Sequence, residues 1–157
     1  MLSNQQAIDI LNQAELIIPA EEVQAAVMSV ARQINTRLTD MHPLLLSVMG
    51  GAVVFTGQLL PLLTFPLDFD YVHVSRYGSN TKGGTLHWKV EPRENVTGRV
   101  VLVVDDILDE GETLAAIKQR VLDLGAAKFY SAVFADKRIG KAKPIHADFV
   151  GVELPDR

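Results

Sequence analysis

The chain has 157 residues and a net charge of −4; 48% of its residues are hydrophobic, 22% are charged and none is cysteine. This length suits a single domain over residues 1–157, and the composition excludes a disordered chain or a disulfide scaffold. A chain without cysteine or a signal peptide is typical of a reducing compartment, so we expect a cytoplasmic protein. No apolar run approaches the ~20 residues that cross a bilayer, and the negative charge predicts no nucleic-acid partner.

Two helices are predicted in the first forty residues. Ser3, with Gln6 three residues later, forms a capping-box pattern that predicts a short helix ending near Leu16. A second helix is predicted over residues 20–38, because apolar residues recur there at helical spacing. They are Val23, Val27, Val30, Ile34 and Leu38. The second helix should therefore bury one face in the core.

A strand that ends at a glycine pair comes next. Residues 44–49 are almost all aliphatic and predict a buried strand, followed by Gly50 and Gly51 and then by a helix over residues 52–60. Such a pair lets backbone N–H groups approach an anion, although a plain strand-to-helix turn is the simpler interpretation. We therefore treat Gly50 and Gly51 as binding candidates only.

The middle of the chain predicts two strands around a loop. Residues 67–74 alternate in the way of a half-buried strand, and residues 86–90 return as another strand. Residues 75–85 between them are rich in glycine and small polar side chains, which predicts a mobile loop. Residues 95–98 predict a turn into the next strand.

The chain is organised around residues 100–114. Five aliphatic residues, 100–104, predict a strand buried on both faces, and Asp105 and Asp106 follow at its carboxyl end. In open α/β sheets ligands bind at that edge, and the helix that follows directs free N–H groups into the same space. Residues 109–113 could therefore cradle a phosphate, with Gly111 permitting close backbone approach and Thr113 adding a hydroxyl. Asp105 and Asp106 could accept hydrogen bonds from sugar hydroxyls.

Helix capping is the simpler explanation for each of these acids alone. The whole pattern is more specific than capping requires, and no G-x-G-x-x-G or G-x-x-x-x-G-K-[ST] run is present to favour a dinucleotide or P-loop site. A helix over residues 114–124 and a strand over residues 129–134 follow, then a basic loop over residues 135–144. Strands that alternate with helices predict a doubly wound, mainly parallel α/β sheet of about five strands, with a small hood from the chain ends.

The aliphatic strand, the acid pair and the Asp-Glu-Gly-x-Thr turn together resemble the phosphoribosyl pyrophosphate motif of the type I phosphoribosyltransferases. The end of the chain is similar to the base-binding region of the hypoxanthine-guanine branch: a strand ending in Lys137, a linker, and Asp-Phe-Val-Gly-x-Glu-Leu-Pro-Asp. This resemblance implies that Lys137 bonds the purine 6-oxo group, that Phe149 stacks on the ring and that Val150 offers main-chain contacts. Asp156 would orient a magnesium ion through water.

Two further stretches resemble the same branch, each with a departure. The glycine pair is similar to the branch's pyrophosphate-binding loop, but Met49 stands where many members carry Lys. The stretch after Ser75 resembles a flexible loop that closes over the reacting centre, with Tyr77 as its tyrosine. Arg76 stands there in place of the usual Ser. Members also continue beyond the Pro-Asp-Arg that ends this sequence, so either a further segment follows Arg157 or the hood over the base is incomplete.

The resemblance implies purine salvage: transfer of ribose 5-phosphate from phosphoribosyl pyrophosphate to hypoxanthine or guanine, with release of pyrophosphate and with Mg²⁺ as cofactor. Asp109 is the candidate for taking the proton of the purine's position-7 nitrogen. Glu110 and Glu112 would bind phosphate through their backbone N–H groups, and their carboxylates must point away. A homodimer or homotetramer is expected. Two alternatives stay open: a regulatory RNA-binding protein that keeps this fold, and a phosphoribosyltransferase for xanthine or a pyrimidine.

Overall fold

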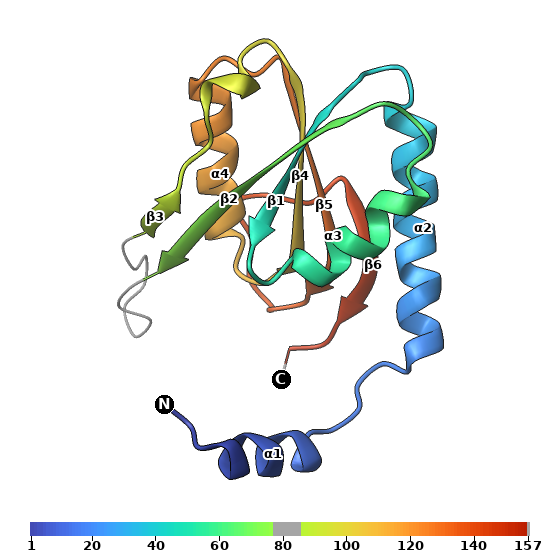
Figure 1. The fold of residues 1–157 in the computed structure, drawn as a ribbon, viewed down its shortest axis with the longest axis vertical. Coiled ribbons are helices and arrows are strands. Elements are labelled where there is room, and N and C mark those ends of the chain that lie inside the picture. The colour runs from blue at the N-terminus through green and yellow to red at the C-terminus, as the bar shows by residue number, and fades with distance from the viewer. Residues whose placement is uncertain (77–85, 157) are drawn as a thin grey trace.

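The computed structural model describes residues 1–76 and 86–156, so Tyr77, Arg157 and most of the predicted loop lie outside the described residues. The described part consists of a sheet with helices on both faces (Figure 1). The helices are α1 (Asn4–Gln13), α2 (Ala20–Leu38), α3 (Val53–Leu59) and α4 (Glu112–Asp123). The strands are β1 (Leu44–Met49), β2 (Asp68–Arg76), β3 (Leu86–Val90), β4 (Val100–Leu108), β5 (Lys128–Lys137) and β6 (Phe149–Leu154).

The sheet has six strands in the order β3-β2-β1-β4-β5-β6. All neighbouring pairs are parallel except β2 and β3, which form an antiparallel pair at one edge. The five parallel strands therefore direct their carboxyl ends to one side of the molecule. The predicted doubly wound, mainly parallel sheet is confirmed, with six strands instead of about five, and its antiparallel strand β3 is the strand predicted over residues 86–90.

Two hydrophobic cores explain why the central strands are apolar on both faces. On one face, α2 and α3 pack on residues such as Leu45, Leu102 and Ala132. On the other face, α4 packs on residues such as Leu46 and Val103. Because successive side chains of a strand point to opposite faces, a run of aliphatic residues fills both cores at once.

Strand β4 is longer than the sequence predicts, which corrects one boundary. The aliphatic run ends at Val104, but β4 continues through both acids to Leu108. The extension is held by parallel pairing with β5, which continues as far as Leu108 opposite Asp136. Asp105 and Asp106 thus lie on a strand that projects beyond its neighbour β1, whose pairing with β4 ends at Val104.

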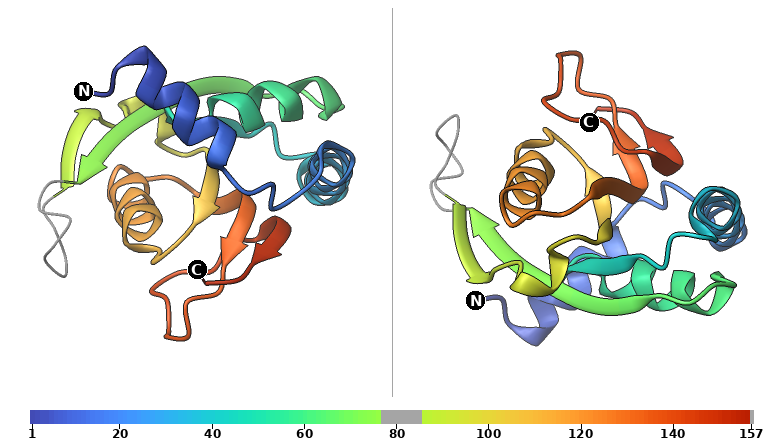
Figure 2. Two further views of the ribbon diagram at one scale, coloured as in Figure 1. Left: turned by 90° about the horizontal axis from the view of Figure 1, so that it is seen from below. Right: turned by 90° about the horizontal axis from the view of Figure 1, so that it is seen from above.

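The N-terminal helix α1 lies beyond the carboxyl ends of the strands (Figures 1 and 2). The predicted capping box is present, since Ser3 Oγ accepts from the N–H of Gln6 and the Gln6 side chain accepts from the N–H of Ser3. No residue of α1 is buried. Within the described residues, no helix is long and apolar enough to span a membrane.

Candidate active site

The carboxyl edge of the sheet gathers most of the predicted site residues. The glycine pair follows β1, the acid pair lies near the end of β4, the turn at residues 109–111 leads into α4, and Lys137 ends β5. Asp156 follows β6 on the same side. Parallel strands bring these segments together although more than a hundred residues separate the first from the last.

Gly51 lies directly against the acid pair. A Cβ atom at Gly51 would sit 2.7 Å from Oδ2 of Asp106, closer than real Cβ contacts. A Cβ at Gly50 would meet nothing within 4 Å. The peptide bond between Met49 and Gly50 is cis. The second glycine of the pair is therefore required by its contact with Asp106, which places the backbone of this turn beside the acids.

The two acids each bind the next backbone N–H. Asp105 Oδ1 accepts from the N–H of Asp106 at 2.8 Å, and Asp106 Oδ1 accepts from the N–H of Ile107 at 2.8 Å. Burial raises the pKa of Asp105 from its ordinary 3.8 to about 7, assisted by the hydrogen bond and the charge of the Asp106 side chain and opposed by the backbone N–H of Asp106. The pair is thus able to hold one proton near neutral pH.

The raised pKa of Asp105 predicts a pH-dependent stability. The folded state binds this proton more tightly than the unfolded chain. The protonated Asp105 therefore adds to the free energy of unfolding, fully below pH 3.8, and this stabilisation is lost as the pH rises through about 7. Asp105→Asn cannot titrate, so we expect wild type to lose free energy of unfolding relative to this variant over that range. Urea unfolding at several pH values measures the difference, with Asp123→Asn as a surface control. Parallel pH profiles for wild type and Asp105→Asn would contradict the raised pKa.

The turn after β4 has the shape of an anion cradle. Gly111 has a φ of +87°, a left-handed conformation that side chains rarely adopt, and it directly precedes the first residue of α4. Thr113 lies half-buried in the first turn of α4, where free N–H groups and the positive end of the helix dipole attract negative charge. The turn and the start of the helix lie where the sequence predicts them, and phosphate binding there stays a prediction.

Both glutamates of this turn are paired with cations. The Glu110 carboxylate lies 3.6 Å from Nζ of Lys141, and Glu112 Oε2 accepts from the guanidinium of Arg76 at the end of β2. Pairing with these cations offsets negative charge that would repel a phosphate. Arg76, the departure noted in the sequence, thus serves as the partner of Glu112.

Lys137 lies between two predicted site residues. Its Nζ is 3.8 Å from Oδ1 of Asp109 and 3.6 Å from Oδ1 of Asp156, and its side chain is 25% exposed. The same lysine lines a cavity of about 230 Å³ whose other walls are apolar. Those walls are Ile17, Ile107, Leu154 and Pro155. Leu154 and Pro155 belong to the stretch that resembles a base-binding region, whereas no pattern in the sequence singled out Ile17 or Ile107, although Ile107 lies between Asp106 and Asp109 on the edge where ligands were expected.

Phe149 and Val150 do not line this cavity. Phe149 is 3% exposed and packs under α2, with its ring stacked on Tyr130 at a centroid distance of 6.2 Å. Val150 packs against the core on the opposite face. This arrangement matches core packing in a strand, and the structure does not bring either residue to Lys137. Their roles toward a base stay predictions.

The fold and the site together define a class of protein, and comparison with known sequences agrees. Residues 17–156 match the phosphoribosyl transferase domain family, and the chain belongs to this family. Within it, the chain is related to hypoxanthine-guanine phosphoribosyltransferases. It is 31% identical to the enzyme of that name from Bacillus subtilis over 143 residues, 90% of this chain and 79% of the relative.

Two further similarities point to the same branch. The hypoxanthine-guanine-xanthine phosphoribosyltransferase of Tritrichomonas foetus is 30% identical over 87% of this chain and 75% of its own length. Among solved structures, a hypoxanthine-guanine phosphoribosyltransferase from Bacillus anthracis superposes with a TM-score of 0.83 at 26% identity, over 91% of this chain and 85% of that chain.

Proposed function

We propose that this protein transfers ribose 5-phosphate from phosphoribosyl pyrophosphate to hypoxanthine or guanine, in purine salvage. The observation that carries the proposal is the position of Lys137, whose side chain lines an apolar cavity and whose ammonium lies 3.8 Å from Asp109 Oδ1. A flat, largely apolar base with one oxo group fits such a site. The phosphate turn and the acid pair lie on the same edge, as a ribose 5-phosphate joined to that base requires.

The reaction exchanges one bond at the ribose for another. The position-9 nitrogen of the purine forms a bond to the anomeric carbon, while the bond from that carbon to the pyrophosphate oxygen breaks and its electron pair leaves with pyrophosphate. Asp109 accepts the proton of the position-7 nitrogen. Lys137 donates to the 6-oxo group and so stabilises the negative charge that develops on this oxygen as the proton leaves. Asp105 and Asp106 hold the ribose hydroxyls, and the backbone at Gly111 and Thr113 holds the phosphate.

Magnesium fits the donor set in one particular way. The described residues contain no group of three or more His, Asp or Glu side chains that could hold a metal ion by themselves. Mg²⁺ commonly uses one or two carboxylates together with waters and substrate phosphates, so Asp105 or Asp106 would hold it with the substrate, and Asp156 through water. When bound, it neutralises charge on the departing pyrophosphate.

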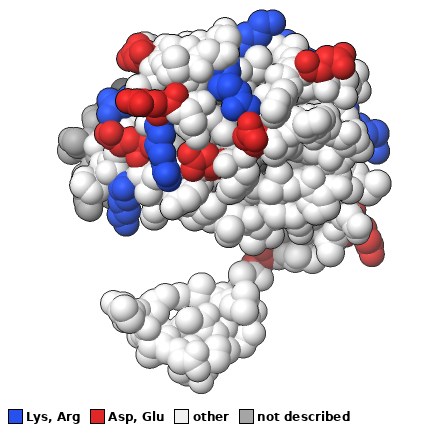
Figure 3. All heavy atoms as spheres, turned by 45° about the horizontal axis from the view of Figure 1, so that its top comes forward, with Lys and Arg blue, Asp and Glu red and all other residues white. Residues whose placement is uncertain are grey.

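The RNA-binding alternative requires a basic face. On the face that Figure 3 shows, acidic and basic side chains are interspersed over the body of the molecule. Several cations are moreover paired with acids, as in the Arg138–Glu153 and Lys141–Glu110 pairs. This arrangement favours the enzyme.

Xanthine keeps the 6-oxo group that Lys137 would bind, so among the alternative substrates it is the one hardest to distinguish from hypoxanthine and guanine.

The test of the proposed function is an assay of nucleotide and pyrophosphate formation. The protein is supplied with phosphoribosyl pyrophosphate, Mg²⁺ and one of hypoxanthine, guanine, xanthine or uracil. We expect inosine or guanosine monophosphate and an equal amount of pyrophosphate. Absence of both products with every base, together with salt-dependent retention on RNA, would favour the regulatory alternative instead.

Gly51→Ala should weaken binding of phosphoribosyl pyrophosphate. The added methyl group meets the Asp106 carboxylate, which must move. Overpacking of this kind costs roughly 1–3 kcal/mol, and an Asp106 carboxylate that moves to relieve it no longer lies where it is proposed to hold the ribose hydroxyls. Calorimetric titration measures the loss. Gly57→Ala in α3 is the matched control, because a Cβ there meets nothing within 4 Å. Equal affinities for wild type and Gly51→Ala would separate the glycine turn from the substrate site.

Thr113→Val should weaken binding of phosphoribosyl pyrophosphate and of nucleoside monophosphate, but not of free base. The change removes one hydroxyl donor to a charged phosphate, which is worth roughly 1.5–3 kcal/mol in a desolvated site. Titrations with nucleotide and with free base measure the two effects, and Thr113→Ser should retain most of the nucleotide affinity. If base and nucleotide lose affinity equally, the turn has only a structural role.

We also propose that the protein acts in the cytoplasm as a homodimer or homotetramer. Exposed apolar side chains on α1 and α3 support an oligomer, since nothing in the described chain covers them. They are Ile8, Ile10, Leu11, Val53 and Val54. Light scattering coupled to size-exclusion chromatography measures the mass directly, and a mass of 17.2 kDa would show a monomer.

A further inference from the structure

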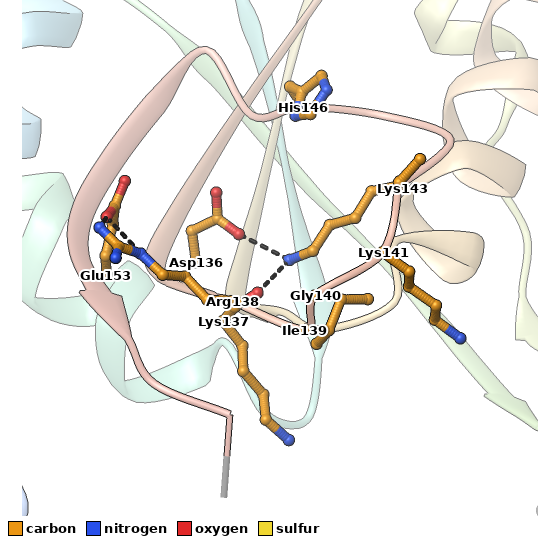
Figure 4. Close-up of a pocket in the computed structure, with 10 residues that line it drawn as sticks. Asp136, Lys137, Arg138, Ile139, Gly140, Lys141, Lys143, His146 and Glu153 are labelled. Atoms are coloured by element: carbon orange, nitrogen blue, oxygen red, sulfur yellow. Dashed lines mark hydrogen bonds and ion pairs between the residues drawn. The ribbon is translucent and has the colours of Figure 1, made fainter.

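A buried ammonium group joins two strand ends beside the candidate active site. Lys143 lies in the connection between β5 and β6, and its side chain is 8% exposed. Its Nζ donates to the carbonyl oxygen of Leu108 at 2.9 Å, to Oδ1 of Asp136 at 2.7 Å and to the carbonyl oxygen of Lys137 at 2.5 Å. Figure 4 shows this side chain reaching back from the loop to Asp136 and Lys137. Three elements thus meet at one nitrogen.

All hydrogen-bond donors of the Lys143 ammonium have acceptors. An ammonium group has three donors and no acceptor, and here each donor has an acceptor within hydrogen-bonding distance. The carboxylate of Asp136 compensates the buried positive charge, which would otherwise be costly to remove from water. The geometry is therefore well determined, unlike that of an exposed lysine such as Lys141 in the same loop.

The two carbonyl groups lie at the strand ends that carry Asp109 and Lys137. Leu108 ends β4 and directly precedes Asp109, while Lys137 ends β5. The pairing of the two strands ends at Leu108 opposite Asp136. Lys143 therefore joins the two strand ends at the point where the pairing between the strands stops. Asp109 and Lys137, whose Oδ1 and Nζ are 3.8 Å apart, lie directly beside these hydrogen bonds.

We propose that Lys143 is a positioning residue that sets the separation of Asp109 and Lys137. This inference rests on the proposed function. The position-7 nitrogen and the 6-oxo group lie side by side on one edge of a 6-oxopurine, so the proton acceptor and the ammonium donor must be held at a matching distance. Through one nitrogen, Lys143 holds the carbonyl group of Lys137 and that of Leu108, the residue that directly precedes Asp109. It touches neither the base nor the ribose in this scheme.

The first test compares Lys143→Met with Lys128→Met. Methionine keeps the length of the side chain but has no donor, so both carbonyl groups and Asp136 lose their partner. A misplacement of about 1 Å at a reacting centre costs up to about a hundredfold in rate. We therefore expect kcat with hypoxanthine to fall by about 10- to 100-fold, while KM for phosphoribosyl pyrophosphate stays nearly unchanged. Lys128→Met, at the exposed start of β5 and away from the site, should keep wild-type kcat.

The second test separates positioning from folding. Lys143→Met leaves a carboxylate half-buried without its cation, so stability can fall as well as activity. Asp136→Asn combined with Lys143→Met removes that charge, and we expect urea unfolding to return toward the wild-type midpoint. The kcat of this double variant should stay low, because the carbonyl groups of Leu108 and Lys137 are still released. Recovery of kcat together with stability would overturn the proposal.

The third test asks whether Lys143 acts through Asp109. In Asp109→Asn there is no base left to position, so adding Lys143→Met should lower kcat by much less than it does in wild type. Independent, multiplying losses would overturn the proposal. Nucleotide formation by wild type distinguishes the two failures: an inactive wild type contradicts the proposed function, whereas an active wild type with unchanged kcat in Lys143→Met contradicts only the positioning role.

Discussion

Asp109→Asn is expected to lower kcat by about 10²–10⁴, the range typical of a positioned general base, while nucleotide affinity changes much less. Asp109 directly follows β4 and its side chain is exposed, with Lys137 Nζ 3.8 Å from its Oδ1. An amide keeps the size of the side chain but cannot accept the proton of the position-7 nitrogen. The loss should therefore appear in turnover rather than in binding.

Steady-state kinetics and nucleotide titration together measure this effect. Asp123→Asn, on the exposed end of α4, is the control for a lost carboxylate and should keep wild-type turnover. An unchanged kcat in Asp109→Asn would remove Asp109 from the catalytic role, and the acid pair would be the next place to look for a base.

Adenine is expected to be rejected by a factor of about 10⁴ relative to hypoxanthine, because sites built on hydrogen bonds discriminate by leaving polar groups unpaired. The Lys137 ammonium can only donate, and in the proposed function it meets a 6-oxo acceptor of hypoxanthine or guanine. Adenine presents a 6-amino donor instead, so two donors would face each other where Lys137 lines the apolar cavity. Ring shape alone could not discriminate so strongly.

The corresponding variant is Lys137→Met, which should reduce the ratio of kcat/KM for hypoxanthine to that for adenine by lowering the hypoxanthine value. Lys128→Met, at the exposed start of the same strand, controls for loss of a cation from β5. Comparable use of adenine by wild type, or an unaltered base profile in Lys137→Met, would remove Lys137 from base recognition.

The elements with strong local patterns could be predicted from the sequence. Strand β1 and helix α2 have the predicted bounds, since an unbroken aliphatic run and a helical stripe leave little choice of structure. The end of β4 could not be predicted in this way, because acids usually end a strand. Pairing with β5 extends it, and that pairing depends on residues about thirty positions away.

The features of the candidate site likewise differ in how far the sequence predicts them. The phosphate turn and the acid pair are contiguous in sequence, so their pattern could be read directly. Lys143 could not be identified, because two of its three acceptors are backbone carbonyl groups, which no side-chain pattern reveals. For Phe149 the family resemblance predicts a role toward the base. In the structure its side chain lies instead on the face of β6 that packs under α2.

The most direct test of the account is a crystal structure of the protein with guanosine monophosphate and Mg²⁺. We predict that the phosphate lies on the backbone N–H groups between Gly111 and Thr113. The ribose hydroxyls should lie at Asp105 and Asp106, and the 6-oxo group within hydrogen-bonding distance of Lys137 Nζ. A phosphate bound instead by the basic loop around Arg138 and Lys141, with the turn before α4 free of ligand, would contradict the assignment of this edge as the active site.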